Sequence, residues 1–111
     1  MKLKEISNKL ELTTATKFFD GERNISGAYT SDLLSDVIAN VKRDNIWVTL
    51  QTHVNIAAVA TLKEITAIII VLNKEIDKDT LEKAESEKIT ILKTALNSYQ
   101  VSGKLYELGI R

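Results

Sequence analysis

The stretch IWVTLQTHVNIAAVATLKEITAIIIVL, residues 46–72, decides the fold. Its two ends, IWVTL (46–50) and AIIIVL (67–72), are runs of β-branched and bulky apolar residues that are typical of buried strands. The segment between them, HVNIAAVATLKEI (53–65), has the apolar spacing of a helix. AIIIVL is apolar on both faces, which is expected of a strand in the middle of a sheet that helices cover on both sides.

The same alternation continues outward from this unit. From residue 25 onward the predicted order is strand, helix, strand, helix, strand, helix, strand, helix, with short connections. The outer elements are ISGAY (25–29), TSDLLSDVIANVK (30–42), DKDTLEKAESEK (77–88), ITILK (89–93) and NSYQVSGKLYEL (97–108), preceded by a helix in LKEISNKLEL (3–12) and a strand in ELTTATKFF (11–19). We predict one α/β domain over residues 1–111, a mostly parallel sheet with helices packed on its faces, preceded by a short N-terminal helix.

Polar residues stand where several of these helices begin. Thr30 or Ser31 can cap one helix, with Asp32 in its first turn, and Thr52 can cap the helix that follows IWVTL. Asp77 is the predicted cap of the next helix. Asn97 caps the last, with Gln100 in the capping-box position, and Gly109 suits the C-terminal end of that helix.

Composition restricts the function. Fifteen basic and fifteen acidic residues cancel, so no broad field attracts nucleic acid or an anionic membrane, and there is little charge repulsion against self-association. The absence of cysteine excludes disulfides, thiolate metal sites and a cysteine nucleophile. The longest apolar run is far too short to span a bilayer. We predict a soluble cytoplasmic protein without membrane or nucleic-acid partners, metal or cofactor.

Two strand-to-helix junctions are the candidate binding sites, because ligands of open α/β sheets bind beyond the carboxyl ends of strands. The predicted ligand-binding residues are Tyr29, Thr30, Ser31, Asp32, Thr49, Gln51, Thr52, His53 and Asn55. Helix capping is the alternative explanation for the polar residues at both junctions. His53 is the only histidine, and with no second histidine or cysteine to complete a nucleophilic or metal constellation, no catalytic residue is predicted.

The helix over residues 53–65 also bears on assembly. It is apolar over most of its circumference, which indicates burial on more than one side. A second subunit would cover the side that the sheet leaves open, so a homodimer is predicted, and packing inside a single core is the alternative. The predicted interface residues are His53, Ile56, Ala57, Ala58 and Ala60.

Three segments resemble the small stand-alone members of the DRTGG-domain family: ISGAYTSDLLSDVIANV, WVTLQTHVNIAAVATLKEITAIIIV and DTLEKAESEKITILKTALNSYQVSGKLYELGI. The resemblance implies an α/β domain like the N-terminal domain of HPr kinase/phosphorylase, which serves as a regulatory or dimerisation module. The naming string Asp-Arg-Thr-Gly-Gly is absent, and Leu72-Asn73 stands where many members have glycines after the central strand. Some stand-alone members are described as serine kinases, but this chain has no P-loop motif.

Three functional hypotheses follow. The first is a non-enzymatic regulatory or interaction module that forms a homodimer and senses a small metabolite or nucleotide. The second is a structural subunit or partner of a larger enzyme complex, such as a redox enzyme, without a ligand of its own. The third, which the residues favour least, is an enzyme that uses His53.

Overall fold

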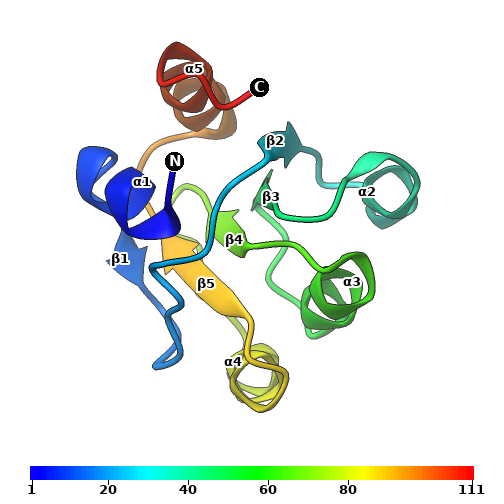
Figure 1. Ribbon diagram of the computed structural model, residues 1–111. Helices are drawn as coiled ribbons and strands as arrows, with labels where there is room; N and C mark the ends of the chain where they lie inside the picture. Colours follow the sequence, from blue (N-terminus) through cyan, green and yellow to red (C-terminus); the bar gives the residue numbers. More distant parts are fainter.

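The computed structural model describes residues 1–111 as three layers, with one five-stranded sheet between two layers of helices (Figure 1). The strand order is β1-β5-β4-β3-β2, parallel throughout except for the antiparallel pair β1–β5. The elements in chain order are α1 (Leu3–Lys9), β1 (Thr13–Thr14), β2 (Gly27–Thr30), α2 (Leu34–Asn40), β3 (Asn45–Thr49), α3 (Asn55–Lys63), β4 (Ala67–Ile70), α4 (Lys78–Ser86), β5 (Thr90–Lys93) and α5 (Ser98–Glu107). The predicted fold class and the alternation from residue 25 onward are confirmed.

The central position of β4 follows from its composition. Every residue of this strand is buried, and Ile68 lies in register with Trp47 of β3 and Ile91 of β5. Because successive side chains of a strand point to opposite faces, a strand with no polar residue must be covered on both sides. The prediction that AIIIVL forms the middle of the sheet is therefore confirmed.

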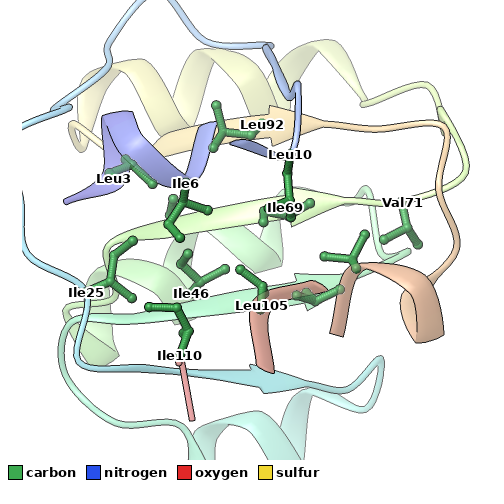
Figure 2. Close-up of a cluster of buried hydrophobic side chains, with 13 residues drawn as sticks. Leu3, Ile6, Leu10, Ile25, Ile46, Ile69, Val71, Leu92, Leu105 and Ile110 are labelled. Atoms are coloured by element: carbon green, nitrogen blue, oxygen red, sulfur yellow. The ribbon is translucent and has the colours of Figure 1, made fainter. Parts of the chain in front are cut away.

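Two separate apolar clusters hold the helices on the two faces of the sheet. On one face α1 and α5 contribute Leu3, Ile6 and Leu105, which pack with sheet residues such as Ile46 and Ile69 (Figure 2). The other face is covered by α2, α3 and α4 (Figure 1). Its cluster contains Val37, Ile56, Ala60, Ala84, Trp47, Ile68 and Ile91. None of the five helices has the length and apolar character needed to cross a bilayer.

The last helix has the predicted ends. Asn97 is the N-cap of α5, and its side-chain oxygen accepts from the Gln100 N–H. The side-chain oxygen of Gln100 in turn accepts from the Asn97 N–H. Gly109 follows the helix with φ of +89°, a backbone conformation that glycine adopts without steric cost. The chain then passes close to β2, where a Cβ on Gly27 would lie 2.6 Å from the carbonyl oxygen of Arg111.

The predicted strand over residues 11–19 is wrong for most of its length. Only Thr13 and Thr14 pair with β5. The chain after them is held through other contacts, because the Thr16 hydroxyl accepts from the Ile91 N–H and the Glu85 carboxylate accepts from the N–H groups of Lys17 and Phe18. The β-propensity of the threonines is real, but tertiary hydrogen bonds determine where pairing ends.

Glu85 gives this segment a pH dependence. Backbone N–H groups of Lys17 and Phe18 donate to it over 2.6 and 2.9 Å, and these bonds lower the pKa of the carboxyl group from its ordinary value of 4.5. A lowered folded-state pKa means that the stabilisation is present above the unfolded-state pKa and is lost as the pH falls through the folded-state pKa. We expect Glu85→Gln to be less stable than the unmodified chain at neutral pH.

That stability difference should shrink on acidification and vanish once Glu85 is protonated in both states. Urea unfolding of both proteins at neutral pH and at successively lower pH measures it. Glu82→Gln is the matched control, because Glu82 on the same helix is 67% exposed and has only a 4.0 Å ion pair. A stability difference for Glu85→Gln that does not change with pH would contradict the role of the charged form.

Candidate functional site

The carboxyl ends of the four parallel strands form one edge of the sheet. Strands β2, β3, β4 and β5 end at Thr30, Thr49, Ile70 and Lys93, and the loops that lead into α2, α3, α4 and α5 begin there. This is the edge at which open α/β sheets bind ligands. All the predicted ligand-binding residues lie in or next to the β2–α2 and β3–α3 connections.

Asp32 ties the β2–α2 loop to the end of β3. One oxygen of its carboxylate accepts from the Thr49 hydroxyl and from the Leu50 N–H, both over 2.8 Å. The Gln51 side chain donates to the Asp32 carbonyl over 2.9 Å, while the Gln51 N–H donates to the Thr49 hydroxyl. The structure thus brings together Asp32, Thr49 and Gln51, three of the predicted ligand-binding residues. Their hydrogen bonds, however, join the two loops to each other.

The side chains of Tyr29 and Thr30, before Asp32, form hydrogen bonds on opposite faces of the sheet. Tyr29 donates its hydroxyl hydrogen to the Asp36 carboxylate over 2.8 Å, and the Thr30 hydroxyl shares a hydrogen bond of 2.7 Å with Ser102 of α5 on the other face. The pKa of Asp36 is lowered by hydrogen bonds from Ser31 and Tyr29, and the pKa of Tyr29 is raised because its hydroxyl bonds to that carboxylate. Tyr29 and Thr30 therefore do not converge on one pocket.

Neither predicted cap at these junctions forms. Helix α2 begins at Leu34 with Leu33 as its N-cap, and Ser31 instead accepts from the Leu33 N–H. Helix α3 begins at Asn55, with Val54 as N-cap and no side-chain cap bond. The predictions that Thr30 or Ser31 caps α2 and that Thr52 caps α3 are wrong, because the hydroxyls before α2 bond elsewhere and both helices begin further along the chain.

His53 lies before α3 and pairs with the N-cap residue of α4. Its Nδ1 is 2.9 Å from an Asp77 carboxylate oxygen, and the two side chains are 70% and 44% exposed. The Thr52 carbonyl beside it accepts from the Thr80 hydroxyl over 2.7 Å, which further joins the β3–α3 connection to α4. Asp77 occupies the predicted N-cap position but makes no capping bond with its side chain. A surface pair of this kind contributes roughly 0–1 kcal/mol.

The predicted interface residues divide into two groups. Ile56, Ala57 and Ala60 are buried within the chain itself, whereas His53 and Ala58 are exposed. Other apolar side chains of α2 and α3 remain exposed as well, including Leu33 at 64% and Leu62 at 67%. We define the α2–α3 surface as five exposed apolar residues on, or at the start of, these two neighbouring helices: Leu33, Ile38, Val54, Ala58 and Leu62.

The turn after β4 keeps a left-handed backbone without glycine. Leu72 and Asn73 have φ of +60° and +48°, the region that glycine occupies most readily. Their N–H groups donate to the carbonyls of Leu96 and Thr94, so the β5–α5 loop closes this turn. These two amides are therefore not free to hold an anion.

Sequence reasoning missed a cleft of about 450 Å³ at the other half of the same edge. It lies at the ends of β4 and β5. Its lining includes Lys9, the last residue of α1, together with Lys93 at the end of β5 and Lys104 of α5. These lysines come from three distant segments with no common motif. Only the topology, which places the end of α1 and the α5 helix on one face, brings them together.

The chain's sequence matches no family model and no curated protein. Among solved structures, it is similar to the regulatory region of a pyrophosphatase from Clostridium perfringens, a structure of the CBS and DRTGG domains in complex with the activator diadenosine tetraphosphate. The TM-score is 0.70 at 16% identity, and the match covers 92% of this chain and 44% of that chain. This likeness shows a fold shared with part of a regulatory region; membership of the DRTGG family stays a prediction.

Proposed function

We propose that the chain is a non-enzymatic regulatory or interaction module that works as a cytoplasmic homodimer and responds to a small metabolite or nucleotide. The observation that carries the non-enzymatic part of this proposal is that the polar groups at the ends of β2 and β3 hydrogen-bond to other groups of the chain. Asp32, Thr49 and Gln51 hold two loops in place, and His53 bonds to Asp77. No hydroxyl donates to His53, as a nucleophile activated by it would.

The shared fold supports the regulatory part of this proposal. The similar structure is a regulatory region with a bound nucleotide activator, and nothing in the present chain resembles a P-loop. Because only 44% of the neighbour is covered, its whole activity is not carried over. What is proposed for this chain is the effector-responsive character of such a region.

The α2–α3 surface supports the homodimer. Val54, Ala58 and Leu62 are spaced four residues apart on or at the start of α3, so they form one stripe along it. Val54 and Leu62 are 41% and 67% exposed, and Ala58 between them permits close approach of a second helix. Burying this stripe against the same stripe of a second copy would stabilise the dimer by roughly 25 cal/mol for each Å² of apolar surface removed from water.

Ala58→Glu tests the homodimer. Because Ala58 is exposed, a glutamate fits in the single chain and the fold should persist, as circular dichroism would show. In a two-fold dimer the change places charge in an apolar interface, so the dissociation constant should rise by about tenfold or more. Tyr99→Glu is the matched control, because Tyr99 is 88% exposed on α5, on the opposite face of the sheet.

Light scattering of the three proteins over a micromolar concentration series decides the matter. The proposal expects Ala58→Glu to dissociate at concentrations where the unmodified chain and Tyr99→Glu remain dimeric. Equal self-association of all three would exclude the α2–α3 surface as the interface. A folded chain that is monomeric even before substitution would favour the second candidate, in which the same apolar surface binds a subunit of a larger complex.

A further inference from the structure

The cleft at the ends of β4 and β5 collects unpaired positive charge. Lys9, Lys93 and Lys104 line it, and none of the three forms an ion pair, although lysine and arginine side chains form six ion pairs elsewhere in the chain. Glu11 is the only carboxylate among the lining residues. Three lysines against one acid leave a net positive cleft in a chain whose total formal charge is zero.

The neighbouring hollow extends this feature along α5. Lys9 and Lys104 also line that second, smaller hollow, together with Glu107. The two lysines come from the last turns of α1 and α5, the two helices that cover one face of the sheet. They therefore face a common space from two sides, and Lys93 at the end of β5 adds a third positive group beside the first hollow.

Neutral donors accompany the lysines. The N–H of Ala95, in the loop after β5, donates to no backbone carbonyl, and Ala95 is exposed. Asn73, also exposed, places an amide side chain beside the same cleft. Both residues follow the carboxyl ends of parallel strands, where ligands of open α/β sheets bind.

We propose that this cleft binds the phosphate groups of a small phosphorylated metabolite or nucleotide. The three lysines outnumber Glu11 in the lining and repel one another, and a multivalent anion would reduce that repulsion. Lysine binds phosphate as a point charge and needs no glycine-rich loop, so the absence of a P-loop does not weaken the site. A volume of about 450 Å³ lies within the range of small-molecule sites.

The regulatory meaning of this site rests on the proposed function, but its binding does not. Isothermal titration of the unmodified chain with sodium pyrophosphate and with ATP, both without magnesium at low ionic strength, tests the binding directly. Lys9→Gln and Lys104→Gln should each weaken the affinity about five- to tenfold. Lys78→Gln is the control, because the Lys78 side chain is 92% exposed on α4, which packs on the opposite face.

The results separate the sources of phosphate. Tighter binding of ATP than of pyrophosphate supports a nucleotide, and equal binding supports recognition of the phosphates alone. Absence of binding to both compounds at about 10 mM overturns the site, and so does an equal loss of affinity in Lys78→Gln. Light scattering under the same conditions keeps the two proposals distinct, because a monomeric chain that binds phosphate would retain the site while the homodimer fails.

Discussion

Replacing Trp47 with alanine should lower the free energy of unfolding by about 3–5 kcal/mol, the usual cost of removing a large aromatic side chain from a core. Trp47 is completely buried in the cluster under α2, α3 and α4. Its indole N–H also donates to the Ser31 carbonyl over 2.8 Å, so the same side chain holds the start of the β2–α2 loop. Urea unfolding followed by circular dichroism measures the change.

Two further substitutions separate packing from the hydrogen bond. Trp47→Phe keeps most of the apolar volume and removes the indole donor, so its loss should be smaller, on the order of 1–3 kcal/mol. Tyr99→Ala removes an aromatic residue that is 88% exposed and should change stability by less than about 0.5 kcal/mol. A loss for Trp47→Ala no larger than for Tyr99→Ala would contradict its place in the core.

Replacing Asp32 with alanine should cost about 1–3 kcal/mol, because it removes the acceptor of two hydrogen bonds. The Thr49 side chain belongs to a fully buried residue, and without Asp32 its hydroxyl loses its acceptor at the end of β3. The Leu50 N–H loses its acceptor at the same time. The expected result is therefore a less stable chain with a looser β2–α2 connection, measured by urea unfolding and by faster amide exchange at Leu50.

Asp32→Asn is the conservative control for this prediction. Its amide oxygen can accept from the same donors, so Asp32→Asn should be more stable than Asp32→Ala. It should remain slightly less stable than the unmodified chain, because hydrogen bonds to a charged acceptor are stronger. Equal stability of Asp32→Ala and the unmodified chain would contradict the structural role. It would also return Asp32 to the predicted role of a ligand-binding carboxylate.

The fold could be predicted because hydrophobic patterning carries most of its information. The apolar run in β4 requires cover on both faces, and the alternation around it leaves a mostly parallel sheet as the simplest arrangement. The cap of α5 could also be predicted, because the side chains of Asn97 and Gln100 each accept a hydrogen bond from the backbone N–H of the other residue. Local rules work where no distant group competes for the same atoms.

The start of helix α2 was mispredicted for the opposite reason. Thr30 and Asp32 have the side chains of capping residues, but Ser102 and the end of β3 offer them partners that are distant in sequence. A single sequence gives no means of weighing these partners against the local backbone. The same hydrogen bonds join the two loops at the predicted ligand-binding junction, and ligand binding there stays a prediction.

Two features could not be predicted from the sequence: which residues of α3 are buried, and which lysines line the cleft. Both depend on how distant elements pack in three dimensions. The helix is apolar on nearly every side, so its pattern could not distinguish Ile56, which faces the sheet, from Leu62, which faces solvent. Lys9 and Lys104 are separated by almost the whole chain, and only the packing of α1 and α5 on one face makes them neighbours. Neither feature has a signature within a short window of sequence.

The mass of the unmodified chain in solution tests the homodimeric module most directly. Light scattering coupled to size-exclusion chromatography, over a micromolar concentration series, should give twice the chain mass of 12.4 kDa. The Ala58→Glu comparison would then show whether the α2–α3 surface forms the interface of that dimer. A mass of 12.4 kDa at every concentration would contradict the homodimer.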